Sequence, residues 1–188
     1  MKITLRRCIY KNGLDIIAPL KCGTRWLEGL DVENRIDTFG IDITDLEKHI
    51  HSGTTFIWRP VREHFLSGTQ TELSFKPQLN IIDIVTNMIE GGSVHWYPYL
   101  YKKLYPLHKN LGFRFYKLQD LSELTLTDSK LHWSPDQYKF KLPTKYSSIE
   151  TELSNLPYEH SIQLEKLISE EEKWIKLMVG PHYNGKNW

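Results

Sequence analysis

The sequence predicts an α/β protein built on a parallel sheet, and the prediction rests on the pattern of its first third. Short apolar or β-branched segments have the length and composition of buried strands at residues 14–18, 36–43 and 54–58. A segment with helix signals follows each of them, at residues 25–30, 45–51 and 60–66. Strands and helices that alternate in this order are typical of parallel sheets.

Proline, glycine and threonine residues mark the ends of these segments. Pro19 ends the first strand, because proline cannot donate to the hydrogen-bond ladder of a sheet. Thr44 is expected to cap the second helix and Gly53 to end it. Pro60 lies where a helix tolerates proline best, in its first turn. Strand–helix units are therefore expected to follow one another as far as residue 66.

The rest of the chain predicts further elements in a less regular order. Helical spacing or helix signals occur at residues 81–89, 99–111 and 161–178. Strand-like segments occur at residues 94–97 and 113–118. A stretch that mixes Pro, Ser and Tyr predicts a long loop at residues 127–149. Because a chain of this length suits one domain, we expect a single domain over residues 1–188, with the last helix packed on the sheet.

Composition and charge exclude several classes of protein. The formal net charge is +1, so no overall field draws the chain to nucleic acid or to a membrane surface. No segment approaches the ~18 apolar residues of a membrane span, and the first residues lack the apolar run of a signal peptide. Cys8 and Cys22 lack metal-ligand spacing and favour a reducing compartment. We expect a soluble cytoplasmic protein without bound metal, membrane or nucleic acid.

A turn with the features of an anion-binding loop follows the first strand. Gly23 has no Cβ, so the backbone there can approach an anion closely. The start of the next helix offers N–H donors and a partial positive charge. Lys21 adds a full charge, Thr24 a hydroxyl and Arg25 a second charge. The plainer interpretation is that such turns simply favour glycine and threonine, with Lys21 exposed to solvent.

A second turn of this kind follows the third strand. Arg59 comes directly after that strand, and arginine makes forked, charge-assisted bonds to phosphate. Ser67 follows about two helical turns later and can donate its hydroxyl to the same group. The plainer interpretation is a surface arginine and a Ser67-Gly68 pair that ends the helix.

Together, the two turns resemble the donor site of sulfotransferases. Residues 21–27, Lys-Cys-Gly-Thr-Arg-Trp-Leu, resemble the family's loop for a 5′-phosphosulfate, usually Pro-Lys-x-Gly-Thr-Thr-Trp-Leu. Residues 56–68 resemble its 3′-phosphate segment, in which an arginine and a serine have the same spacing. The His-Trp-Tyr-Pro sequence at residues 95–98 is similar to a segment of the carbohydrate-type enzymes, and residues 113–124 resemble the strand and turn that come next in those enzymes. The resemblance touches most of residues 14–125.

The resemblance implies a three-layer fold with helices on both faces of a parallel sheet, like the P-loop nucleoside triphosphate hydrolases. It also implies a co-substrate, 3′-phosphoadenosine 5′-phosphosulfate, and no metal. Lys21 would neutralise charge on the bridging oxygen, Trp26 would lie near the adenine, and Arg59 with Ser67 would hold the 3′-phosphate. Backbone N–H groups of the loop, with the Thr24 hydroxyl, would cradle the 5′ group. The implied donor-site residues are Lys21, Cys22, Gly23, Thr24, Arg25, Trp26, Arg59 and Ser67.

The acceptor hydroxyl also needs a base, and here the sequence departs from the family. The family commonly has a histidine at the end of the second strand, where this chain has Asp42. Aspartate is a weak base near its ordinary pKa of about 3.9, and His51 and His49 are nearby alternatives. The plainer interpretation is that Asp42 caps a helix and that both histidines are solvated at its end. The interval from Lys21 to Arg59 is also shorter than usual, which predicts an altered acceptor pocket. The expected catalytic residues are Lys21, Asp42 and His51.

The sequence leaves two other functions open. Residues 94–119 interleave basic side chains with aromatic rings and contain no acidic residue, a composition that suits single-stranded nucleic acid or an anionic sugar. A solvated basic face above a buried aromatic face is the plainer interpretation of that segment. A nucleotide kinase relative is disfavoured because the Gly-x-x-x-x-Gly-Lys-Ser/Thr pattern is absent. We prefer a sulfotransferase that acts on a small-molecule or carbohydrate hydroxyl, with a non-catalytic nucleotide- or polyanion-binding protein as the alternative.

Overall fold

The computed structural model describes residues 3–11, 13–22, 24, 27, 35–118 and 147–180. The described residues fall into two compact units. The first, here called the sheet unit, comprises the described residues of Met1–Arg59 and Leu107–Phe140. The second, called the helical unit, comprises those of Pro60–Pro106 and Lys141–Asn187.

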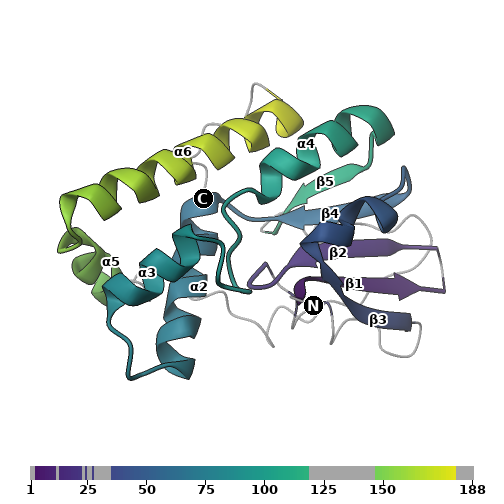
Figure 1. Cartoon of the computed structure of the whole chain (residues 1–188). Coiled ribbons are helices and arrows are strands. Elements are labelled where there is room, and N and C mark those ends of the chain that lie inside the picture. The colour runs from purple at the N-terminus through teal and green to yellow at the C-terminus, as the bar shows by residue number, and fades with distance from the viewer. Residues whose placement is uncertain are drawn as a thin grey trace. The chain divides into compact units, whose positions relative to one another are not determined.

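The sheet unit is a five-stranded mixed sheet with the order β3-β1-β2-β4-β5 (Figure 1). Its strands are β1 (Ile3–Tyr10), β2 (Asp15–Pro19), β3 (Arg35–Asp42), β4 (Thr54–Trp58) and β5 (Arg114–Lys117). β1 is antiparallel to both of its neighbours, whereas β2–β4 and β4–β5 are parallel pairs. The α/β class and four predicted strands are therefore confirmed. The prediction of a wholly parallel sheet was wrong.

β1 makes the sheet mixed, and the sequence holds a signal for it that we did not use. The four residues between β1 and β2 include Asn12-Gly13 in the sequence, and this pair is a strong signal for a hairpin. Gly13 has a φ of 81°, which glycine adopts without strain. Its N–H donates to the Tyr10 carbonyl at 3.0 Å, and the Tyr10 N–H donates to the Leu14 carbonyl at 2.9 Å. A hairpin of this kind requires β1 and β2 to be antiparallel.

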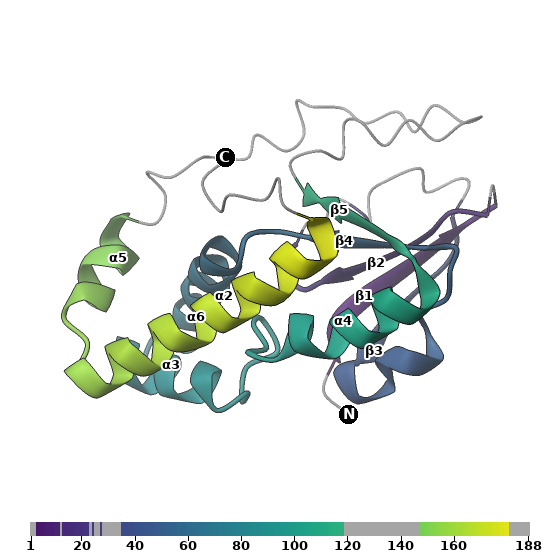
Figure 2. The ribbon, with the colours of Figure 1, turned by 90° about the horizontal axis from the view of Figure 1, so that it is seen from above.

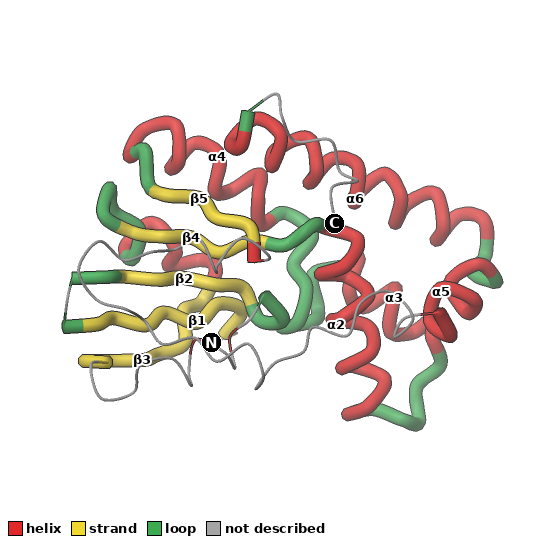
Figure 3. The backbone as a smooth tube through the Cα atoms, turned by 180° about the vertical axis from the view of Figure 1, so that it is seen from behind, coloured by secondary structure: helices red, strands yellow, loops and turns green. Residues whose placement is uncertain are grey.

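The other four strands all point the same way, which brings their carboxyl ends to one edge of the sheet. Figure 3 shows the same five strands, in yellow, from behind. β2 and β3 are both antiparallel to β1, so they are parallel to each other in direction. β4 and β5 follow the direction of β2. We call this the carboxyl edge, and its strands end at Pro19, Asp42, Trp58 and Lys117.

The core of the sheet unit lies on both faces of the central strands. β2 and β4 are buried along their whole length, as expected for strands that read as continuous apolar runs. On one face, an apolar cluster includes Ile16, Ala18 and Cys22. On the other face, Phe115 stacks with Trp58, with ring centroids 5.5 Å apart. These contacts hold the strands whose ends carry both predicted phosphate motifs.

The segment between β3 and β4 forms a 3-10 helix, η1 (Ile43–Lys48), where we predicted a short helix over residues 45–51. Asp42, not Thr44, is its N-cap, because the Asp42 carboxylate accepts the Thr44 N–H. The predicted helix at residues 25–30 lies mostly outside the described residues, although Leu27 is in a helical conformation.

The helical unit contains α2 (Val61–Phe75), α3 (Ile81–Ile89), α5 (Ser147–Ser154) and α6 (Tyr158–Val179) (Figure 2). α4 (Leu100–Leu111) begins in this unit and passes into the sheet unit at Leu107. α6 packs against α2 and α3 through a stripe of buried apolar residues, Leu164, Leu167, Ile168, Ile175 and Met178. None of the helices in the described ranges is long and apolar enough to cross a membrane.

The middle of the chain differs from the sequence prediction at one segment. No strand forms at residues 94–97, which were predicted as one. The segment packs on α2 instead, where Trp96 contacts Phe65 edge-on with ring centroids 5.3 Å apart. The predicted loop at residues 127–149 lies mostly outside the described residues, and α5 begins within its last residues.

Candidate functional site

The carboxyl end of β2 turns sharply into the loop with the first predicted phosphate motif. The Cys22 N–H donates to the Pro19 carbonyl at 2.9 Å and closes the turn. Lys21 has a φ of 72°, and within the described residues no other non-glycine residue has a positive φ. Left-handed backbone costs an L-residue about 1–2 kcal/mol, so the turn stores strain at Lys21. Such strain is concentrated at functional positions, and a glycine here would relieve it.

Arg59 follows β4 and links the two predicted phosphate motifs. β4 is the parallel neighbour of β2, with Ile17 paired to Phe56, so the two strands end side by side. Arg59 is 9% exposed, and its Nη1 donates to the Lys21 carbonyl at 2.9 Å. A charged donor makes this bond stronger than one between neutral groups. The structure therefore joins the turn after β2 directly to the residue after β4.

The remaining donor-site residues are placed less completely. Cys22 is fully buried in the apolar cluster, so its side chain faces the core of the sheet unit. Thr24 is half-buried and helical. Ser67 lies on α2 in the helical unit, is half-buried, and accepts the Thr71 hydroxyl at its carbonyl at 2.9 Å. The other predicted donor-site residues lie outside the described residues, namely Gly23, Arg25 and Trp26.

Asp42 lies at the carboxyl edge, where its side chain caps η1. Its Oδ1 accepts the Thr44 N–H at 2.9 Å and the Thr44 hydroxyl at 2.8 Å. This is the capping role of the plainer interpretation. Only β1 separates β3 from β2, so two strand spacings, about 10 Å, lie between the ends of β3 and β2. Asp42 thus shares an edge with Lys21 and Arg59 while it serves as a cap.

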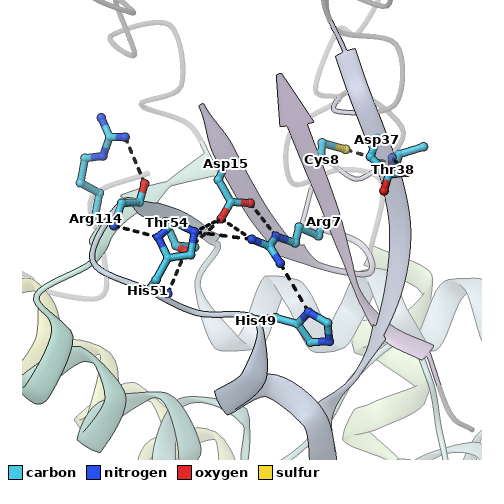
Figure 4. Close-up of polar contacts among 10 residues, drawn as sticks. Arg7, Cys8, Asp15, Asp37, Thr38, His49, His51, Thr54 and Arg114 are labelled. Atoms are coloured by element: carbon cyan, nitrogen blue, oxygen red, sulfur yellow. Dashed lines mark hydrogen bonds and ion pairs between the residues drawn. The ribbon is translucent and has the colours of Figure 1, made fainter. Parts of the chain in front are cut away.

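His51 lies at the opposite edge of the sheet, where β2 and β4 begin (Figure 4). Its Nε2 is 2.8 Å from Asp15 Oδ2, and its Nδ1 accepts the Gly53 N–H at 3.1 Å. The Gly53 bond makes Nδ1 an acceptor, so Nε2 is the ring nitrogen that can donate to Asp15. Asp15 starts β2, and the strand's five residues span about 15 Å to its carboxyl end. The structure therefore does not bring His51 to Lys21.

Asp15 is the centre of a buried polar cluster that we did not predict. Arg7 makes a forked pair with it, Nε to Oδ1 at 2.7 Å and Nη2 to Oδ2 at 2.9 Å. The Thr54 hydroxyl donates to Oδ2 at 3.1 Å, and Arg7 Nη1 lies 3.4 Å from His49 Nδ1. The cluster ties β1, β2 and β4 together. The one charge inside the apolar segment 14–18 was the signal that could have revealed it.

A second buried polar cluster surrounds Glu72 in the helical unit. Its Oε1 accepts the Ser93 hydroxyl and His95 Nδ1, the latter at 2.9 Å, and its Oε2 pairs with Lys76 at 3.0 Å. Burial alone would raise the pKa of Glu72, but the bonds from Ser93, His95 and Lys76 outweigh burial and lower that pKa to about 2. A Cβ on Gly68 would lie 3.1 Å from the His95 carbonyl oxygen. These contacts hold the His95 segment tightly on α2.

A buried glutamate holds the start of α4. Glu171, on α6, is 2% exposed, and its Oε2 accepts the Tyr101 N–H at 2.7 Å. Burial raises the pKa of Glu171 to about 8, and the backbone bonds from Tyr101 and Lys102 oppose this rise without cancelling it. The neighbouring charge of Glu170 adds to the rise. Glu171 thereby satisfies N–H groups that a helix leaves unpaired in its first turn.

The basic aromatic segment, residues 94–119, buries several of its rings. Trp96 and Tyr101 are each 2% exposed, and Phe113 is 1% exposed. Its lysines in α4 are exposed, namely Lys102, Lys103 and Lys109. A buried aromatic side beneath exposed lysines agrees with the plainer interpretation, in which the rings serve packing.

Comparisons with known proteins do not assign the chain. No family model matches it, and no curated protein or solved structure is detectably similar to it. Within the described ranges, no group of three or more His, Cys, Asp and Glu side chains could hold a metal ion.

Proposed function

We propose that the chain is a sulfotransferase that moves a sulfuryl group from 3′-phosphoadenosine 5′-phosphosulfate to an acceptor hydroxyl. The observation that carries this proposal is the 2.9 Å bond between Arg59 Nη1 and the Lys21 carbonyl. It joins two strand ends at the edge where ligands of open α/β sheets bind. Lys21 offers a charge to the phosphosulfate and Arg59 a forked donor to the 3′-phosphate.

The proposed reaction is an in-line transfer in which charge moves onto the leaving nucleotide. The S–O bond to the 5′-phosphate breaks, a new S–O bond forms to the acceptor oxygen, and the hydroxyl proton passes to a base. The Lys21 ammonium would stabilise the negative charge that develops on the bridging oxygen. Because the Cys22–Pro19 and Arg59–Lys21 bonds already fix this turn, little reorganisation is needed during the reaction.

Asp42 is the proposed proton acceptor, because it shares the carboxyl edge with Lys21 and Arg59. A carboxylate has two oxygens with about four lone-pair sites, so it can cap η1 and still accept a proton. His51 is left out of this proposal because it lies at the other edge. We propose a carbohydrate hydroxyl as the acceptor, following the resemblance of residues 95–98.

Calorimetry with adenosine 3′,5′-bisphosphate, the desulfated nucleotide, tests the proposal directly. The unmodified chain should bind it, and Arg59→Ala should weaken binding about ten- to a hundred-fold, as expected for a lost hydrogen bond to a charged group. Arg62→Ala is the matched control, because exposed Arg62 pairs with Glu165 on α6 at 2.7 Å. The control should change affinity less than about two-fold, since exposed ion pairs contribute little. Undetectable binding by the unmodified chain would end the proposal.

A further inference from the structure

The Lys21–Cys22 peptide is held on both of its sides. Its carbonyl oxygen accepts Arg59 Nη1 at 2.9 Å, and its N–H donates to the Pro19 carbonyl at 2.9 Å. A trans peptide is planar, and its C=O and N–H point in opposite directions. The two bonds therefore fix the orientation of the whole peptide plane, directly after the left-handed φ of Lys21.

The Arg59 guanidinium can hold the Lys21–Cys22 peptide and bind a ligand at the same time. A guanidinium carries five N–H donors in a rigid plane, so it can bond a carbonyl along one side and an anion along another. Arg59 is 9% exposed, and burial restricts its guanidinium to few orientations. An ammonium has no such fork and acts as a single point of charge.

We infer that Arg59 positions the Lys21 turn in addition to anchoring the 3′-phosphate, so that the protein binds the two ends of the nucleotide interdependently. The inference rests on the proposed function for its ligand, and on the Arg59–Lys21 bond for its mechanism. If Arg59 served the 3′-phosphate alone, its loss would not affect a nucleotide without that group. If it also holds the turn, its loss weakens binding at the 5′ end too. Linkage requires that coupling between the two ends be reciprocal.

Amide hydrogen exchange tests the positioning role without any nucleotide. In Arg59→Met, the Cys22 amide should exchange about ten-fold or more faster, because one of the two bonds that fix its peptide is gone. The Gly13 amide is the internal reference, since it donates to the Tyr10 carbonyl at the opposite edge of the same sheet. It should keep its rate. Lys21→Met keeps the carbonyl that Arg59 holds, so the Cys22 amide should exchange there as in the unmodified chain.

Binding of two nucleotides tests the coupling. Arg59→Met should weaken adenosine 5′-monophosphate, which lacks the 3′-phosphate, by about ten-fold, and adenosine 3′,5′-bisphosphate by more. Arg59→Lys keeps the charge but not the fork, and should recover part of the bisphosphate affinity with little of the monophosphate affinity. Arg62→Met should leave both affinities unchanged.

The two measurements separate this inference from the proposed function. An unchanged Cys22 exchange rate in Arg59→Met, or equal acceleration at Cys22 and Gly13, overturns the positioning role. Unaltered monophosphate affinity in a protein that binds the bisphosphate overturns the coupling. If the unmodified chain binds neither nucleotide, the proposed function and the coupling both fail, and the exchange result still decides whether Arg59 holds the turn.

Discussion

Replacing Lys21 by glycine should stabilise the fold and weaken nucleotide binding at the same time. Lys21 has a φ of 72°, a conformation that costs an L-residue about 1–2 kcal/mol. Glycine removes that cost but adds about 0.5–1 kcal/mol of backbone entropy loss on folding. The difference predicts a gain of about 0.5–1 kcal/mol in the free energy of unfolding. For a chain of this size, that gain raises the melting temperature by about 1–4 °C.

Urea unfolding and calorimetry on two variants measure the two effects separately. Lys21→Gly and Lys21→Met both remove the charge, so both should weaken adenosine 3′,5′-bisphosphate by about ten- to a hundred-fold. Only Lys21→Gly relieves the left-handed backbone, so only that variant should be more stable than the unmodified chain. A Lys21→Gly protein no more stable than Lys21→Met would refute the claim of strain. Unchanged affinity in both would refute the role of the charge.

Three further substitutions test Asp42, Glu171 and Glu72. Asp42→Asn keeps a good N-cap, so thermal stability should change little while sulfuryl transfer falls about 10²–10⁴-fold; equal activity would remove Asp42 as the base. In the unfolded chain, Glu171 loses its proton near its ordinary pKa of 4.5. In the folded state it keeps the proton up to a pKa of about 8. Stability from this group is therefore present below pH 4.5 and lost as pH rises through 8. Glu171→Gln should be more stable than the unmodified chain at pH 8 by roughly 4 kcal/mol, with the gap closing toward pH 5 in urea titrations. Glu72 has the opposite sign, since its pKa falls to about 2: Glu72→Gln should lose on the order of 2 kcal/mol at pH 7, and the same titrations should show that loss shrinking as pH falls from 4.5 toward 2.

The strands could be predicted where local chemistry decides the structure. Residues 54–58 are β-branched or aromatic, and β4 covers the same residues. β1 was harder, because Arg6-Arg7 interrupts its apolar pattern and only the Asn12-Gly13 pair marks the hairpin. Direction in the sheet follows from that hairpin, which is why a wholly parallel sheet was the wrong inference from strand–helix alternation.

The candidate site could likewise be predicted only in part from the sequence. The residue types at Lys21 and Arg59 could be recognised from sequence, but their contact spans 38 positions and depends on which strands pair. The position of His51 could not be recognised, because its place beside Asp15 depends on how the chain returns from η1 to the start of β4. Proximity in sequence to Asp42 suggested a shared site, whereas the fold places the two at opposite edges.

The Lys21–Cys22 peptide combines two features that cost stability, a left-handed backbone at Lys21 and a buried Arg59 guanidinium. Their combination is the strongest physical reason to regard the Lys21 turn as a site. A left-handed lysine is less stable than a glycine in the same place. The Arg59 side chain is only 9% exposed, so its guanidinium loses hydration on folding. An apolar side chain of similar size would not lose it, and replacing buried charged groups by apolar ones is often neutral or stabilising. A sequence shaped by stability alone would avoid both features. Under the proposed function, the nucleotide would offset both costs, because its 5′ group would pair with the Lys21 ammonium and its 3′-phosphate with the Arg59 guanidinium. The Lys21→Gly and Arg59→Met variants should therefore fold well and bind poorly.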